Sequence, residues 1–192
     1  MNAILGTSDA CIAVHPSDMC VALAVLEADV HVTGPRGERK IALLDFHRLP
    51  GDTPQRDTNL AADELITAIE LPARGFASNH TYLKIRDRLS YAFALVSVAA
   101  GLELDGGNIK EARFALGGVA HKPWRNPEAE AALRGKAASE ATFAQAADIL
   151  LREAKGFGGN TFKIELARRT IVRALSQAAR GTPQSQSNKK IA

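Results

Sequence analysis

The segment YLKIRDRLSYAF, residues 82–93, concentrates basic side chains that could meet an anion. Lys84, Arg86 and Arg88 lie two residues apart, and side chains on a strand alternate between its faces, so these three are expected to share one face. If that face lines a cleft, its charge suits a phosphate or an anionic, reduced flavin. The spacing alone favours the other interpretation, an exposed edge strand whose charges oppose aggregation.

The stretch GTSDACIAVHPSDM, residues 6–19, gathers a thiol, carboxylates, hydroxyls and an imidazole near the start of the sequence. Ser17 can cap a helix and Asp18 favours its positive end, which explains both residues without a ligand. Because Cys11 and Cys20 are the only two cysteines, the sequence contains neither a disulfide framework nor a complete cysteine metal site. Cys11 is therefore a small buried residue or one ligand of a larger site. Structural and functional interpretations of this stretch stay equally open.

Other motifs carry weaker signals. The segment ALGGVAHKPWR, residues 115–125, has two glycines beside His121 and Lys122, but no GK[ST] or GxxG follows. Close strand packing before a turn is therefore favoured over a phosphate site. His47 and His80 are isolated in the sequence, and no HxH or HExxH spacing occurs, which argues against a zinc enzyme. A GxSxG nucleophile elbow is also absent from the sequence.

The elements of the first half follow from hydrophobic periodicity and turn residues. A helix is expected over residues 17–27, where apolar side chains recur at helical spacing. A β-hairpin is expected from residues 29–34 and 39–46, and a further strand from residues 64–72. One helix and one hairpin have little apolar surface for a complete lobe, so part of this lobe is expected to be missing or supplied by another chain.

The second half is expected to be a β-meander covered by helices. Residues 73–79 suit a linker, and TYLKIRDR, which begins at Thr81, starts a strand. Two long strands across residues 91–119 meet at Asp105-Gly106-Gly107-Asn108, whose residues tolerate a positive φ. Three helices are expected over residues 126–135, 140–154 and 160–180, with Gly135, Gly156 and Gly181 at their ends.

Composition narrows the class of protein. The 192 residues are 46% hydrophobic and 23% charged, as in a soluble globular protein. No run approaches the roughly 18 apolar residues that span a bilayer, and the first residues lack signal-peptide features. The net charge of +3 is spread along the chain and aromatic residues make up 5%, so nucleic acid is not an expected partner, and neither is a membrane.

Five segments carry a combined signal. In sequence order they are AILGTSDACIAVHPSDM, DFHRLPGDTP, LAADELITAIELP, YLKIRDRLSYAFALVSVAA and LDGGNIKEARFALGGVAHKPWR. Together these segments resemble the FAD-binding subunit of the molybdenum hydroxylases, the group of xanthine dehydrogenase, carbon monoxide dehydrogenase and aldehyde oxidoreductase. The likeness covers about residues 2–180 and is nearest to the medium subunit of bacterial three-subunit aldehyde oxidoreductases.

This resemblance implies an α+β fold and an electron-transfer function. Residues 1–75 would form part of an FAD-binding lobe, and residues 76–180 a C-terminal domain with a three-stranded antiparallel sheet and about three helices, followed by a disordered tail over residues 181–192. FAD would pass electrons from iron–sulfur clusters to an acceptor. The implied partners are a large molybdopterin-binding subunit and a small subunit with two-iron two-sulfur clusters, in the cytoplasm or exported with a partner to the periplasm.

The resemblance also implies cofactor-binding residues. Ser17 and Asp18 match the family's Ser-Asp pair, whose Asp contacts FAD. Lys84 and Arg88 match a basic pair beside the isoalloxazine ring, and Leu60 an apolar residue near it. The remaining implied FAD contacts are Thr7, His15 and Tyr91, where Tyr91 replaces a residue that is often acidic in relatives.

Cys11 resembles the last cysteine of a four-iron four-sulfur cluster in the aldehyde oxidoreductase branch. Such a cluster normally needs four thiolates, so three would have to precede residue 1. Family members also begin with a further hundred or so residues that bind the FAD pyrophosphate. The sequence thus suggests a truncated or split subunit with weak or absent FAD binding. The alternative function is an interaction module that docks onto partner subunits without binding FAD.

Overall fold

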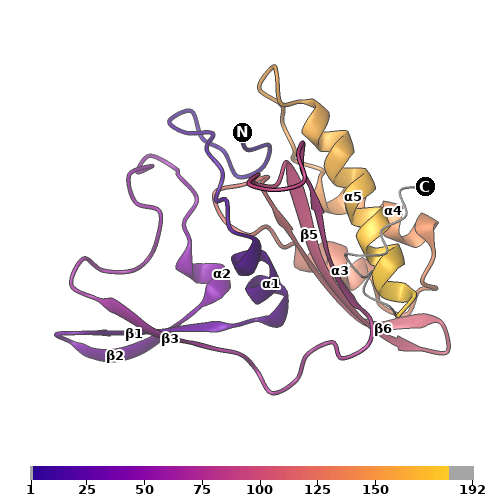
Figure 1. Ribbon diagram of the computed structural model, residues 1–192, viewed down its shortest axis with the longest axis horizontal. Coiled ribbons are helices and arrows are strands. Elements are labelled where there is room, and N and C mark those ends of the chain that lie inside the picture. The colour runs from indigo at the N-terminus through magenta and orange to yellow at the C-terminus, as the bar shows by residue number, and fades with distance from the viewer. Residues whose placement is uncertain (1, 182–192) are drawn as a thin grey trace.

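The computed structural model describes residues 2–181, which form a small sheet beside a larger sheet covered by helices (Figure 1). The small sheet has the strand order β2-β1-β3 and the larger one β4-β5-β6, and all the pairings are antiparallel. This arrangement confirms the expected α+β class. The elements in chain order are α1 (Asp18–Leu26), β1 (Asp29–Gly34), β2 (Gly37–Ala42), α2 (Leu43–Phe46), β3 (Leu65–Glu70), β4 (His80–Ile85), β5 (Val96–Asp105), β6 (Asn108–Gly117), α3 (Pro127–Leu133), α4 (Glu140–Leu150) and α5 (Phe162–Ala179).

Helix α1 begins and ends where its sequence predicts. The Ser17 side chain accepts a hydrogen bond from the backbone N–H of Cys20, at 3.2 Å, and Asp18 lies in the first turn near the positive end of the helix. Glu27 adopts a left-handed conformation with φ 56° and terminates the helix. The predicted helix over residues 17–27 is confirmed.

The small sheet confirms the predicted hairpin but shortens its second strand. The sequence predicted a strand over residues 39–46, whereas β2 ends at Ala42 and residues 43–46 form the short helix α2. The apolar side chains Leu43 and Phe46 are three residues apart, so one helical turn buries both, while a strand would place them on opposite faces. Strand β3 then pairs with β1 and forms an edge of this sheet, with all six of its residues exposed.

The β5–β6 hairpin confirms the strongest turn signal of the sequence. Gly106 and Gly107 have φ values of 55° and 86°, which glycine adopts without a steric penalty. The first long strand starts later than predicted, at Val96 and not at residue 91. Residues 86–95 instead form a loop that is exposed except at Ala92, Ala94 and Leu95. Tyr91 in this loop has a positive φ of 51°.

The larger sheet is covered on both faces. Figure 1 shows α1 on one face of the larger sheet and α3, α4 and α5 on the other. Val98, Phe114 and Leu116 belong to the main core with these three helices, and alternate residues of the same strands belong to the core under α1. Ala99 and Ala115 are small, which allows α1 to lie close to the strands. The larger sheet of the same chain therefore contributes to the core under α1. The expectation that part of this lobe is missing or supplied by another chain stays a prediction.

The three predicted helices of the second half are present as α3, α4 and α5. Asn126 caps α3 by accepting hydrogen bonds from the N–H groups of Glu128 and Ala129. The tail predicted to be disordered lies, apart from Gly181, outside the described residues. Within residues 2–181, no helix is both long and apolar enough to cross a membrane.

Residues 71–79 link the two sheets, and an aromatic side chain of this linker packs against the larger sheet. A Cβ atom added to Gly101 would lie 2.2 Å from Cδ2 of Phe76, and the Arg113 guanidinium lies 5.4 Å from the Phe76 ring centroid. Gly101→Ala is therefore expected to lower the free energy of unfolding by about 1–3 kcal/mol in urea titrations, because the Phe76 ring must move.

The matched control is Gly75→Ala in the same linker. A Cβ atom there would lie 3.5 Å from Leu26 Cδ2, an ordinary van der Waals contact. Its effect on the free energy of unfolding is expected to stay within about 0.5 kcal/mol. Equal effects of the two substitutions would show that the Phe76 contact does not hold the linker.

Candidate functional site

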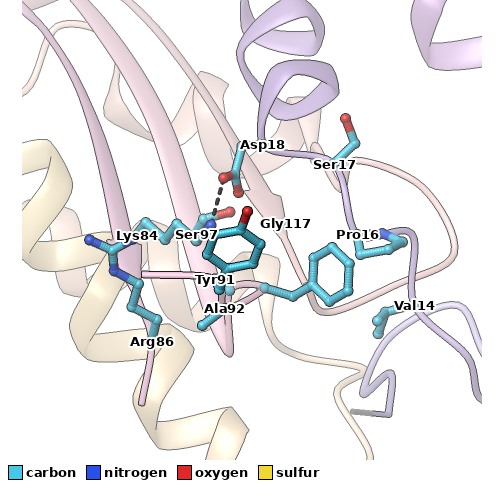
Figure 2. A pocket seen from close by; sticks show the side chains of 13 residues that line it. Val14, Pro16, Ser17, Asp18, Lys84, Arg86, Tyr91, Ala92, Ser97 and Gly117 are labelled. Carbon is cyan, nitrogen blue, oxygen red and sulfur yellow. Dashed lines mark hydrogen bonds and ion pairs between the residues drawn. The ribbon is translucent and has the colours of Figure 1, made fainter. Parts of the chain in front are cut away.

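A pocket of about 600 Å³ lies where the start of α1 meets the larger sheet and the 86–95 loop. Figure 2 shows its lining, with Asp18 above Lys84 and the Tyr91 ring beside them. The volume is within the range of small-molecule sites, about 300–1,000 Å³. Its walls come from both halves of the chain.

The strand register sets the floor of the pocket. Lys84 on β4 is directly opposite Ser97 on β5, and Ser97 is opposite Gly117 on β6, so the three residues form one row across the sheet. A Cβ atom on Gly117 would lie 2.6 Å from Val21 Cγ2 and 2.5 Å from Ser97 Oγ. Glycine at this position therefore allows α1 to approach the sheet beside the pocket.

Asp18 connects α1 to this row. Its carboxylate forms an ion pair with Lys84 Nζ at 2.7 Å (Figure 2). The carboxylate also accepts a hydrogen bond from the Tyr82 hydroxyl at 2.9 Å. Burial raises the pKa of Tyr82 above its usual value, and the Asp18 carboxylate adds to this effect. The phenol therefore stays protonated and donates to Asp18. Tyr82 and Lys84 are both half-buried, and together they orient Asp18, which has the only carboxylate in the described lining of the pocket.

The rim of the pocket is an aromatic loop. Tyr91 is 95% exposed and Phe93 is 62% exposed, and both line the pocket. Arg88 Nε donates a hydrogen bond to the Tyr91 carbonyl at 3.0 Å, which helps to hold the strained residue in place. Flat rings beside a positive wall can cover a planar, electron-rich ligand.

The predicted cationic face is only partly present. Lys84 and Arg86 both line the pocket, but β4 ends at Ile85, so the alternation does not continue to Arg88. The guanidinium of Arg88 bonds within its own loop instead. The interpretation as a plain edge strand is incomplete as well, because Lys84 faces α1 and forms an ion pair with Asp18.

The structure brings some predicted site residues together and leaves others apart. Ser17, Asp18, Lys84 and Tyr91 line one pocket, although the Ser17 hydroxyl is engaged as the helix cap. The other four predicted contacts are not part of this lining: Thr7, Arg88, Leu60, which packs against the core under α1, and His15, which lies against His47 with ring centroids 4.2 Å apart. Their roles toward FAD stay predictions.

Nine of the thirteen lining residues were not among the predicted cofactor contacts, and three of these nine have side chains that could contact a ligand. Ser97 and Phe93 gave no signal in the sequence, because a serine in an apolar strand and a phenylalanine beside it resemble core residues. Arg86 was recognisable by its period-two spacing from Lys84. The strand register and the loop conformation, which bring these residues into the pocket, are tertiary features.

Cys11 lies away from this row, in a bridge with Ser8, and its Sγ atom is 3.2 Å from His121 Nε2. A four-iron four-sulfur cluster needs four thiolates, whereas the sequence has two cysteines. Among the described residues, no group of three or more neighbouring metal-ligand side chains includes Cys11. The residues of this chain therefore do not fit such a cluster by themselves.

Comparisons with known proteins agree with this architecture. Residues 7–74 match the FAD binding domain in molybdopterin dehydrogenase, and residues 80–178 match the CO dehydrogenase flavoprotein C-terminal domain. The aldehyde oxidoreductase FAD-binding subunit PaoB of Escherichia coli K12 is 48% identical over 178 residues, which are 92% of this chain and 52% of that protein. The carbon monoxide dehydrogenase medium chain of Afipia carboxidovorans is 28% identical over 84% of this chain and 57% of its own length.

Solved structures show the same fold. Quinoline 2-oxidoreductase from Pseudomonas putida 86 superposes with a TM-score of 0.74 and 27% identity, over 88% of this chain and 58% of that one. Carbon monoxide dehydrogenase from Oligotropha carboxidovorans gives a TM-score of 0.74 and 25% identity, over 85% and 57%. The fold is thus that of the flavin-binding subunits of molybdenum-containing oxidoreductases.

The chain belongs to the family of FAD-binding subunits of the molybdenum hydroxylases, as its sequence resemblance indicated. It spans about half the length of the curated relatives that it matches. The described pocket fits the ring part of the family's cofactor in its chemistry, because it combines aromatic side chains, two basic residues and a floor of small residues.

Proposed function

We propose that this chain acts as an FAD-binding electron-transfer component of a molybdenum hydroxylase of the aldehyde oxidoreductase branch. The observation that carries the proposal is the row of Lys84, Ser97 and Gly117 beneath Asp18, which forms a defined pocket in the chain. The 48% identity to an aldehyde oxidoreductase FAD-binding subunit supports the branch. We also propose that residues 1–75 and 76–180 are its two domains.

FAD, when bound, supplies the redox chemistry, and the protein supplies position and charge. In this proposal Lys84 and Arg86 place positive charge beside the isoalloxazine ring, which favours its anionic reduced form. Asp18 fixes the ammonium of Lys84, and Tyr82 fixes Asp18. Tyr91 and Phe93 cover the ring and limit the access of water.

Flavin titration of the purified chain tests this function. FAD is expected to bind weakly, at the upper end of the weak or absent binding that the sequence suggested, with quenching of its fluorescence. Lys84→Ala is expected to weaken this binding at least tenfold, about 1.4 kcal/mol, because the ammonium group that faces the pocket is lost. Lys84→Arg keeps the charge and is expected to retain most of the affinity. Riboflavin, which lacks the adenylate, is expected to compete because the described pocket recognises the ring.

Lys110→Ala provides the matched control, since Lys110 is an exposed lysine in an ion pair with Glu103 on the β5–β6 hairpin. It is expected to leave flavin affinity unchanged. The proposal fails if the wild-type chain binds neither FAD nor riboflavin, or if Lys84→Ala and Lys110→Ala bind FAD equally well.

We also propose that this chain assembles with other subunits. Relatives are named as FAD-binding subunits and medium chains of oxidoreductases, which supports assembly with a large molybdopterin-binding and a small iron–sulfur subunit. A four-iron cluster on Cys11 would require three thiolates from outside this chain.

The alternative function is an interaction module without flavin, and one observation favours it. Strand β3 is an edge strand that exposes Leu65, Ile66 and Ile69, and apolar side chains on an open edge suit contact with another chain. A colourless chain that still co-purifies with a large molybdenum subunit would support this alternative over flavin binding.

A further inference from the structure

Three side chains that can bind metals meet beside the pocket, although they are far apart in the sequence. His15 precedes α1, Cys20 lies in the first turn of α1, and His47 follows α2. One ligand atom from each residue lies within 4.8 Å of the others. The two imidazole rings are inclined by 50°, with their centroids 4.2 Å apart.

Each of the two histidines has one buried ring nitrogen without a hydrogen-bond partner among the described residues. His47 is 7% exposed, and neither its Nδ1 atom nor Nε2 of His15 has a partner among the described residues. Buried polar atoms are nearly always bonded, and leaving one unpaired costs about 1–3 kcal/mol. Both unpartnered nitrogens belong to the same cluster, so one shared ligand could supply a partner for each.

Two charged side chains also act on the imidazole rings. Asp57 adds a negative charge that acts on both histidines, and Lys122 opposes it.

The position of Cys20 adds a sulfur ligand. Its backbone N–H donates a hydrogen bond to the Ser17 side chain, and the residue lies in the first turn of α1. Two imidazole nitrogens and one thiolate are borderline-soft ligands that suit Zn²⁺. Zinc bond lengths of about 2.0–2.3 Å require these atoms to lie about 3.3–3.6 Å apart, so small side-chain rotations would close the site.

We propose that His15, Cys20 and His47 bind one divalent transition-metal ion of the zinc class, with the fourth coordination position open to water. Because Val14 and Pro16, which flank His15, line the pocket, the ion would join the entry of α1 to the segment after α2 and brace one wall. His15 then serves as a metal ligand and not as the flavin contact that the sequence suggested. This site does not depend on flavin binding.

Metal titration of the tag-free, EDTA-dialysed chain tests the proposal. One equivalent of Zn²⁺ is expected to bind, as counted by mass spectrometry of the metal, and to raise Tm. The Co²⁺ form is expected to show visible bands of a four-coordinate ion and a near-ultraviolet thiolate-to-cobalt band. Cys20→Ser should abolish the thiolate band and weaken binding at least about 100-fold, and His47→Gln should weaken it similarly.

Cys11→Ser and His80→Ala are the matched controls, because they change the other cysteine and an exposed histidine. Both are expected to keep one equivalent of metal and the spectrum of the wild type. Circular dichroism establishes that each variant is folded. A wild-type chain that binds no Zn²⁺ or Co²⁺ would overturn the proposal, and so would a thiolate band that is lost in Cys11→Ser and kept in Cys20→Ser.

Discussion

Phe114→Ala is expected to lower the free energy of unfolding by about 3–5 kcal/mol, the largest effect among the substitutions considered for this protein. Phe114 is 0% exposed on β6 and lies in the main core between the larger sheet and the helices. Removing its ring leaves a cavity that neighbouring side chains on a strand and on helices fill only in part. For a protein of this size, Tm should fall by about 10 °C.

Phe93→Ala makes the same chemical change at an exposed position. Phe93 is 62% exposed on the rim of the pocket, so its truncation is expected to change the free energy of unfolding by less than about 0.5 kcal/mol. Urea unfolding followed by circular dichroism measures both variants. If the two substitutions destabilised the chain equally, Phe114 would not be the core residue that the structure describes.

Lys163 is expected to make stability rise with pH in alkaline solution. Its side chain is 1% exposed, and Nζ donates hydrogen bonds to the carbonyl oxygens of Asn2, at 2.9 Å, and Gly118. Burial lowers its pKa from 10.5 to about 8. Between these two pH values the unfolded chain holds a proton that the folded chain has released, so the free energy of unfolding rises, by at most about 3 kcal/mol.

Lys163→Met is expected to remove this rise. The substitution keeps most of the side-chain volume but leaves two carbonyl oxygens without their donor, so absolute stability changes as well, and the comparison is between slopes. Urea unfolding at several pH values from 8 to 10.5 gives these slopes. Lys155→Met, at an exposed lysine, should retain the wild-type slope. A wild-type slope in Lys163→Met would contradict the assignment.

Local sequence signals were sufficient for most elements of the fold. The Asp-Gly-Gly-Asn turn and the Ser17 cap each act within a few residues, and the structure has the hairpin and the helix that they predict. The sequence Leu43–Phe46 was misassigned because four residues cannot distinguish the end of a strand from a helical turn. The resemblance identified the family before any geometry was known.

The candidate site was less predictable, because its residues meet through tertiary contacts. The row of Lys84, Ser97 and Gly117 depends on strand register, which no local pattern specifies. His47 appeared isolated in the sequence, and His15 was given only as an implied FAD contact. Tertiary packing brings their rings together. Arg88 was predicted to share a strand face with Lys84 because the alternation of side chains was extended beyond Ile85, where β4 ends.

The pocket is assembled from residues 14–18 on one side and residues 84–118 on the other, so neither part of the chain contains it alone. A molecule that binds only when these two parts are docked also stabilises their docking, and it does so more strongly the more tightly it binds. Changes that loosen the contact between residues 14–18 and residues 84–118 should therefore also weaken ligand binding in the pocket. Such changes could control how much ligand the pocket holds.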